Sequence, residues 1–369
     1  MHRDKALSQA PEFLSSLIAR EADTQCDCAC LTESFPFTSP LPHPIFYYLE
    51  LTPQCNNHCP GCGNVFAEDR TLQPLSAAQW GEILAQLKPY AVRLKLTGGE
   101  PTLHPQFKEI VALIDDLDIP FALFTNARWL YPEQLLAFLK GILRFGGFLI
   151  SLHGASAVSH DAFTGVPGSF AETVDNIRRA IAAGLSVTTS TVITKHNYSE
   201  VEQIVALSKE LGANHAVFNR YLGQHLPSIE PTNEELKEAM QTIERLRVTA
   251  DYPVKFGNCI PQCFYPSSST GCLAGVAFCT VDPWGNVRPC NHAPRICGNL
   301  LEHSIEEIWN SEAMEYWRRL IPPQCEHCLA FSQCHGGCRA EAMLLGFERD
   351  PLIDQPRVMK AKKLASNHL

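Results

Sequence analysis

Short apolar, β-branched runs alternate with amphipathic segments along the middle of the chain. Runs of the first kind predict strands, and apolar positions that recur every three or four residues predict helices. The predicted strands are 44–51, 92–97, 121–125, 147–152, 186–193 and 215–219. The predicted helices lie near 76–89, 105–117, 132–145, 169–183, 199–211 and 232–249. Six successive βα units predict a parallel sheet, either open and doubly wound or curved into a partial barrel, with ligands at the carboxyl ends of the strands.

Several predicted helices begin with the S/T-x-x-E/Q pattern of a capping box, in which two side chains satisfy free backbone amides. These pairs are Ser76/Gln79, Ser169/Glu172, Ser199/Glu202 and Thr232/Glu235. A further pair, Ser304/Glu307, predicts a helix in the C-terminal part, and residues 282–285 have the composition of a hairpin turn.

Composition and charge narrow the classes of partner. The 369 residues are 45% hydrophobic and 19% charged, which is typical of a globular protein of two or three domains. The net charge is −9 and no long basic run occurs, so we expect neither nucleic acid nor an anionic membrane as a partner. No apolar stretch approaches the roughly 20 residues of a membrane span. The first thirty residues lack the apolar core of an export signal, so we expect a cytoplasmic protein.

In the cytoplasm, clustered cysteines indicate metal ligands or catalytic thiols rather than disulfides. The sixteen cysteines gather in three parts of the chain: Cys26, Cys28 and Cys30; then Cys55, Cys59 and Cys62; then ten between 259 and 338. For the first group the default interpretation is adventitious metal or a redox segment. The other two groups predict metal centres.

The loop "LTPQCNNHCPGCGN", residues 51–64, follows the first predicted strand and contains Cys55, Cys59 and Cys62. Four-iron clusters are normally held by four thiolates. Three thiolates leave one iron open to a small molecule, just as catalytic zinc keeps an exchangeable position. The spacing alone also allows a zinc knuckle, with His58 or a distant residue as the fourth ligand.

The second predicted strand runs into "TGGEP", residues 97–101. Two glycines at a strand end allow close approach of a ligand to the backbone, and Glu100 offers a carboxylate to an ammonium or hydroxyl group. The Cys-x3-Cys-x2-Cys loop and this Gly-Gly-Glu-Pro turn together resemble the radical S-adenosylmethionine (SAM) superfamily. In that family a four-iron cluster sits on the three cysteines, and its free iron binds the amine and carboxylate of SAM. One-electron reduction then yields methionine and a 5′-deoxyadenosyl radical, which takes hydrogen from the substrate.

The resemblance implies further contacts to the cofactor at the strand ends. The implied residues are Gly98, Gly99, Glu100, Pro101, Thr125, Asn126, Ser151, Ser190 and Arg220. Ser151 and Ser190 are alternatively ordinary core hydroxyls. Asp161, Gly165, Gly168 and Phe170 match the family's turn into the next helix. His153 is either a substrate-facing acid or base or a turn histidine, and no catalytic residue is assigned.

A second cysteine field lies after the last predicted helix of the βα region. The arrangement Cys-x12-Gly-x4-Cys, followed by Cys-x2-Cys-x5-Cys-x3-Cys, resembles the SPASM extension of radical SAM enzymes, which binds auxiliary four-iron clusters. Spacing alone leaves zinc and iron–sulfur comparable. The resemblance implies a first auxiliary cluster on Cys272, Cys279, Cys290 and Cys338, and a second on Cys325, Cys328 and Cys334. The family's last cysteine is missing. Either Asp354 takes its place, or one of Cys259, Cys263 and Cys297 does, or the second cluster has an open iron.

We therefore expect an α/β fold, with a partial (β/α)6 TIM-like barrel followed by a small cysteine-rich α+β SPASM module. The expected divisions are an N-terminal extension (1–43), the barrel (44–250), the SPASM domain (251–345) and a C-terminal tail (346–369).

The expected function is that of an oxidoreductase-like radical SAM enzyme that modifies a peptide or protein side chain, with an electron donor such as flavodoxin or ferredoxin. The alternative is a small-molecule or tetrapyrrole reaction, because "SLHGAS" and "FNRY" look like segments of haem-pathway members. A non-catalytic zinc or electron-transfer module is more remote, since it does not explain an incomplete cysteine set beside Gly-Gly-Glu-Pro.

Overall fold

The computed structural model describes residues 40–67, 69–268 and 271–353. Within these ranges one ten-stranded sheet has the order β10-β9-β8-β1-β2-β3-β4-β5-β6-β7. The strands are β1 (Phe46–Glu50), β2 (Arg93–Thr97), β3 (Phe121–Thr125), β4 (Phe145–Ser151), β5 (Val187–Ile193), β6 (His215–Arg220), β7 (Val254–Phe256), β8 (Phe278–Val281), β9 (Asn286–Arg288) and β10 (Gly298–Asn299). All neighbours from β8 through β1 to β7 are parallel, and β9 is antiparallel to both β8 and β10.

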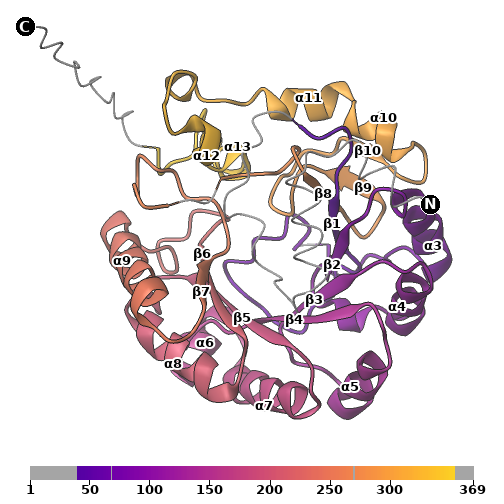
Figure 1. Ribbon diagram of the computed structural model, residues 1–369, viewed down its shortest axis with the longest axis horizontal. Coiled ribbons are helices and arrows are strands. Elements are labelled where there is room, and N and C mark those ends of the chain that lie inside the picture. The colour runs from indigo at the N-terminus through magenta and orange to yellow at the C-terminus, as the bar shows by residue number, and fades with distance from the viewer. Residues whose placement is uncertain (1–39, 68, 269–270, 354–369) are drawn as a thin grey trace, which may run out of the picture.

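Helices α3 to α9 lie around the curved sheet, with α6 packed on α7 beside the cysteine loop, and α10 to α13 lie on the side of the C-terminal part of the chain (Figure 1). The first set is α3 (Ala77–Leu87), α4 (Phe107–Asp116), α5 (Pro132–Lys140), α6 (Ala157–Thr164), α7 (Ser169–Ala182), α8 (Val201–Leu211) and α9 (Asn233–Thr249). The second set is α10 (Ile305–Trp309), α11 (Glu312–Arg318), α12 (Phe331–Cys334) and α13 (Arg339–Leu344). This arrangement confirms the expected partial barrel with a small C-terminal module.

The six predicted strands and the six predicted helices of the βα region are confirmed. The sequence pattern did not predict one further helix, α6. The capping boxes at Ser76, Thr232 and Ser304 are present. The predicted box at Ser169 is wrong, because the N-cap of α7 is Gly168 and the Asp161 carboxylate of α6 accepts the free amides instead. The predicted box at Ser199 is also wrong, because a 3-10 turn (Tyr198–Glu200) precedes α8.

The sheet joins the two expected domains rather than separating them. Strand β7 lies beyond residue 250 and extends the barrel next to β6, while β8 of the cysteine-rich part pairs with β1. An ion pair between Glu50 on β1 and Arg288 on β9 lies buried at this joint, and Asn291 also donates to Glu50. Burial raises the pKa of Glu50 to about 7, although Arg288 opposes the shift.

The main core lies between the sheet and the outer helices, and the C-terminal module extends it. Trp80 of α3 is completely buried there, as are Trp309 and Trp317 of the module. The last two also donate indole hydrogen bonds to Leu41 O (2.8 Å) and Ala274 O (3.0 Å). The Trp309 bond thus ties the module to the segment before β1, and the Trp317 bond lies within the module.

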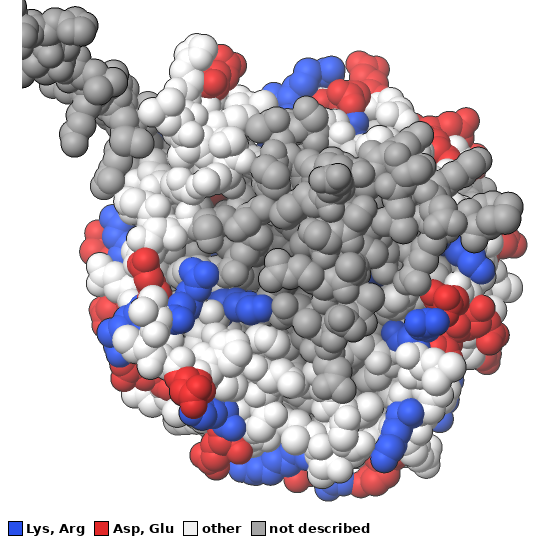
Figure 2. Space-filling view, viewed as in Figure 1, with Lys and Arg blue, Asp and Glu red and all other residues white. Residues whose placement is uncertain are grey.

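The rim of the face in Figure 2 carries both signs of charge, with Lys and Arg interspersed among Asp and Glu. None of the helices in the described part of the chain combines the length and the apolar character that crossing a bilayer requires.

Candidate active site

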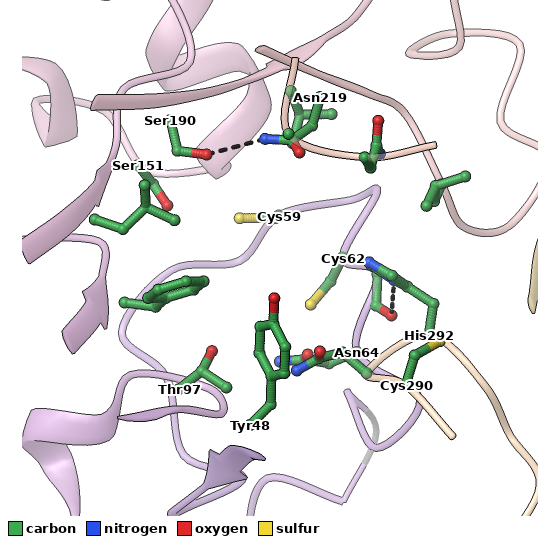
Figure 3. A pocket seen from close by; sticks show the side chains of 18 of the residues that line it. Tyr48, Cys59, Cys62, Asn64, Thr97, Ser151, Ser190, Asn219, Cys290 and His292 are labelled. Atoms are coloured by element: carbon green, nitrogen blue, oxygen red, sulfur yellow. Dashed lines mark hydrogen bonds between the residues drawn. The ribbon is translucent and has the colours of Figure 1, made fainter. Parts of the chain in front are cut away.

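A cavity of about 430 Å³ lies inside the barrel and at the carboxyl ends of its strands. Three parts of the chain line it: the cysteine loop after β1, the ends of the barrel strands, and the cysteine-rich module. Figure 3 shows the thiols of Cys59 and Cys62 pointing into the same space as the hydroxyls of Tyr48, Ser151 and Ser190. The location is the one expected for ligands of a parallel α/β fold.

The cysteine loop places three partly buried thiols on one wall of the cavity. The thiol of Cys55 accepts two weak hydrogen bonds, from Asn57 N at 3.4 Å and from Asn126 Nδ2 at 3.8 Å. Burial raises the pKa of Cys55 to about 11 and that of Cys59 to about 12, and neighbouring thiols of the loop add to both shifts. Binding to a metal releases the protons of such thiols, because the metal stabilises the thiolate form.

The Gly-Gly-Glu-Pro turn packs directly against the backbone of the cysteine loop. Gly99 N donates to Thr52 O (2.8 Å) and Glu100 N donates to Gln54 O (2.7 Å). A Cβ on Gly99 would lie 2.2 Å from Gln54 O, so only glycine fits this position. Asn64 Nδ2 donates to Gly98 O (2.6 Å) and ties the far end of the cysteine loop to the same turn. The residues therefore form a pre-shaped backbone cradle beside the three thiols.

Glu100 does not line the cavity; its carboxylate lies fully buried behind the wall. It accepts hydrogen bonds from Thr125 Oγ1 (2.9 Å) and Asn126 N (2.9 Å) at the end of β3, and from Thr102 Oγ1 (2.6 Å). Burial raises the pKa of Glu100, and these bonds oppose the shift. The expected carboxylate–hydroxyl interaction is thus present, but within the protein, where it connects the ends of β2 and β3.

The other implied cofactor residues occupy different surroundings. Gly98, Thr125, Asn126, Ser151, Ser190 and Arg220 line the cavity, whereas Pro101 does not. Ser151 and Ser190 are neighbours on β4 and β5, and Asn219 Nδ2 donates to Ser190 Oγ (3.1 Å). His153 also lines the cavity, and its Nδ1 accepts from Val192 N (3.3 Å). Burial and the nearby His160 hold the pKa of His153 well below its usual value, so its ring is neutral.

Arg220 forms a buried ion pair with Asp350, which sequence reasoning missed. The guanidinium donates to both carboxylate oxygens, at 3.0 Å and 2.7 Å, and Cys338 N donates to the same carboxylate at 2.7 Å. Burial lowers the pKa of Arg220, but Asp350, Cys338 and Cys259 outweigh it and hold the pKa above the usual value. Arg220 therefore lines the cavity while its two terminal nitrogens bind Asp350 of the C-terminal part.

Four cysteines of the module form a first group on the cavity wall opposite the barrel: Cys259, Cys272, Cys290 and Cys338. A hydrogen bond between the thiols of Cys259 and Cys272 lowers the pKa of Cys272 to about 6 and raises that of Cys259. The structure does not bring the expected Cys279 here. Its neighbour Phe278 lines the cavity, so the thiol of Cys279 faces the opposite side of β8, in the core near Cys297.

A second group contains Cys263 together with Cys325, Cys328 and Cys334. Burial raises the pKa of Cys325 to about 11, and the thiols of the other three add to the shift. The segment that carries Cys263 packs on α12: Gln262 Nε2 donates to Gln333 Oε1 (3.2 Å), and Gly271 approaches Gln333 O so closely that a Cβ would lie 2.1 Å away. The expected ligand Asp354 and the cysteines Cys26, Cys28 and Cys30 lie outside the described residues.

The thiols of both groups are the donors that iron–sulfur clusters use. No disulfide joins the cysteines in the described ranges. Among those residues, no three His, Cys, Asp or Glu side chains surround one metal-ion position. The thiolates of a four-iron cluster bind different iron atoms, so they stand farther apart than the ligands of a zinc ion.

Comparisons with known proteins agree with this geometry. Residues 49–208 match the radical SAM superfamily, and residues 272–334 match the SPASM iron–sulfur cluster-binding domain. The AdoMet-dependent heme synthase of Methanosarcina barkeri is 29% identical over 327 residues, which cover 79% of this chain and 90% of that protein. The PqqA peptide cyclase of Gluconobacter oxydans is 27% identical over 323 residues, covering 84% and 88%.

Two solved structures share the fold. Streptococcus suis SuiB bound to its precursor peptide SuiA has a TM-score of 0.72 at 18% identity, with 85% of this chain and 76% of SuiB covered. The structure of anSMEcpe with bound AdoMet has a TM-score of 0.68 at 16% identity, with 85% and 93% covered. The two family matches, together with the three-cysteine loop, the glycine cradle and the cysteine-rich module, identify the chain as a radical SAM enzyme with a C-terminal SPASM domain.

Proposed function

We propose that this enzyme modifies a side chain of a peptide or protein. When bound, the four-iron cluster and SAM supply a one-electron cleavage of the sulfonium and a radical that abstracts hydrogen. The peptide substrate is supported by the similarity to PqqA peptide cyclases. These relatives match 82% to 84% of this chain, a stretch that includes both the barrel and the SPASM module.

The chain's own residues have separable tasks in this proposal. Cys55, Cys59 and Cys62 hold the cluster and leave one iron open. The backbone of Gly98 and Gly99 receives the methionine part of SAM, in a cradle kept in place by Asn64 and Glu100. The cavity continues from this cradle to the first cysteine group of the module, so a substrate in it lies between the two.

The substrate test is a reaction of the reconstituted, reduced enzyme with SAM and candidate peptides. Peptides encoded next to the gene are the first candidates. The proposal predicts equal amounts of 5′-deoxyadenosine and of a peptide whose mass has changed, with deuterium transferred from labelled peptide into 5′-deoxyadenosine. If all such peptides stay unchanged while a tetrapyrrole is consumed, the peptide assignment is wrong.

A tetrapyrrole reaction is the second candidate, because the heme synthase relative matches 79% of the chain at 29% identity. The same assay decides between the two, with a propionate-bearing porphyrin in place of the peptide. We also propose that the enzyme works in the cytoplasm and that a flavodoxin or ferredoxin supplies the electron that reduces its cluster.

We further propose that the loop of Cys259 and Cys263 supplies one thiolate to each auxiliary cluster. The first cluster would then sit on Cys259, Cys272, Cys290 and Cys338, and the second on Cys263, Cys325, Cys328 and Cys334. The first set is supported by the cavity wall that its cysteines share. The second is supported by the packing of Gln262 and Gly271 against Gln333 of α12. Cys279 and Asp354 would have no role as ligands.

Replacing Cys263 by alanine is expected to lower the iron content below the about 12 atoms of three four-iron clusters. The electron paramagnetic resonance (EPR) signal of one auxiliary cluster should change, because one of its irons loses its ligand. Cys297→Ala and Asp354→Ala serve as controls and should retain all the iron. Full iron and an unchanged spectrum in Cys263→Ala, or iron loss in Asp354→Ala, would refute the assignment.

A further inference from the structure

Lys95 is a lysine buried inside the barrel. Its side chain projects from β2 into the cavity, yet the residue is only 3% exposed. Nζ donates to Tyr48 Oη at 2.9 Å, from the residue paired with Lys95 on β1. The ammonium also lies over two aromatic rings, 4.7 Å from the centroid of Tyr48 and 5.8 Å from that of Phe124. Cation–π contacts and one neutral acceptor offset only part of the cost of burying a charge.

No carboxylate within the described residues pairs with Lys95. The described lining of the cavity contains no Asp or Glu at all, whereas it includes Arg70, Lys95 and Arg220. Arg220 is neutralised by Asp350, and Arg70 donates to the backbone of Asn57 and Ala67. Two N–H donors of Lys95 therefore remain for a ligand, next to a buried ammonium that has no counter-charge among the described lining residues.

The position of Lys95 separates it from the cradle assigned to SAM. Lys95 precedes Thr97 by two residues on β2, which is about 7 Å along a strand, and so lies deeper in the barrel than Gly98. A group bound by Lys95 would thus belong to a molecule that extends below the cradle.

We propose that Lys95 Nζ and Tyr48 Oη bind a carboxylate of the substrate inside the barrel. A carboxylate accepts charge-assisted hydrogen bonds from both groups and supplies the missing counter-charge. The inference rests on the proposed function, since it assumes that the cavity receives a substrate. Two sources share this chemistry: an acidic side chain of a peptide and a propionate of a tetrapyrrole.

The test uses ¹³C-carboxylate-labelled propionate with the reconstituted holoenzyme containing SAM. Relaxation of the label by the reduced, paramagnetic cluster reports binding in the cavity. Wild-type enzyme should give saturable relaxation with propionate and none with propionamide. Lys95→Met should weaken binding by about tenfold or more, the effect of losing a hydrogen bond to a charged group. Tyr48→Phe should weaken it less, and Lys95→Arg should restore most of it.

The control is Lys108→Met. Lys108 is an exposed lysine of α4 that lies over the Phe138 ring of α5, outside the cavity. It should bind propionate as the wild type does. Iron content should be unchanged in Lys95→Met. Equal propionate binding by wild type and Lys95→Met, or absence of saturable binding in the wild type, would overturn the proposal.

Displacement of the label identifies the source of the carboxylate. A capped pentapeptide with a central glutamate should displace propionate, and its glutamine counterpart should not. Displacement by a propionate-bearing porphyrin but not by the glutamate peptide would contradict the peptide function and leave the carboxylate site standing. The two proposals therefore fail in different ways.

Discussion

Alanine at Cys55, Cys59 and Cys62 together is expected to reduce 5′-deoxyadenosine formation to background, while the protein keeps about two thirds of its iron. The reason is that these three thiols share one wall of the cavity, apart from the eight cysteines proposed as auxiliary ligands. The cluster that binds SAM is lost, and the two auxiliary clusters remain. Iron analysis and chromatography of the reaction products measure the two effects on the same sample.

Cys279→Ala is the matched control for this variant. Its thiol lies in the core on the opposite face of β8, so the replacement should leave both the iron content and 5′-deoxyadenosine formation as in the wild type. The site assignment would be contradicted if SAM cleavage survived the triple replacement, or if Cys279→Ala lost a cluster.

Asp350→Asn is expected to destabilise the protein by about 3–5 kcal/mol, the usual cost of removing one partner from a buried ion pair. The side chains of Arg220 and Asp350 are only 3% and 0% exposed, so water cannot replace the lost charge. Asparagine keeps the size of the side chain and an acceptor for Cys338 N. Anaerobic denaturant unfolding of the holoenzyme measures the free-energy change.

An exposed pair provides the comparison for Asp350→Asn. Asp175 pairs with Arg179 on the surface of α7, where both side chains are largely solvated, so Asp175→Asn should change stability little. Adding Arg220→Met to Asp350→Asn should recover part of the loss, because it removes the unpaired cation. If Asp350→Asn were no more harmful than Asp175→Asn, the ion pair would not anchor the module as described.

Local sequence signals predicted the barrel well because they act over short distances. The β-branched runs and the boxes at Ser76 and Thr232 lie where the structure has strands and helix starts. The prediction failed at Ser169, where Asp161 from the preceding helix caps α7 from eight residues away along the chain. A local pattern cannot reveal a cap supplied by a neighbouring helix.

Some contacts around the site join residues that are distant in sequence, so the sequence left Cys259 and Cys263 only as alternative ligands and did not indicate Asp350. Nothing near Cys259 or Cys263 shows that their loop meets α12 and Cys338, and Asp350 meets Arg220 across 130 residues. Lys95 did leave a signal. In "VRLKLT" a lysine interrupts a predicted strand of a parallel sheet. Such sheets are covered on both faces, so a charge there requires a partner or a ligand.

The central claim is that one iron of the N-terminal cluster lacks a protein ligand and takes SAM instead. Electron–nuclear double resonance on the reduced enzyme, with SAM labelled by ¹⁵N in the amine and ¹⁷O in the carboxylate, tests it directly. The account predicts hyperfine coupling of both labels to the cluster in the wild type and in Cys279→Ala, and none in the variant without Cys55, Cys59 and Cys62. A reduced cluster whose spectrum shows no coupling to either label would contradict it.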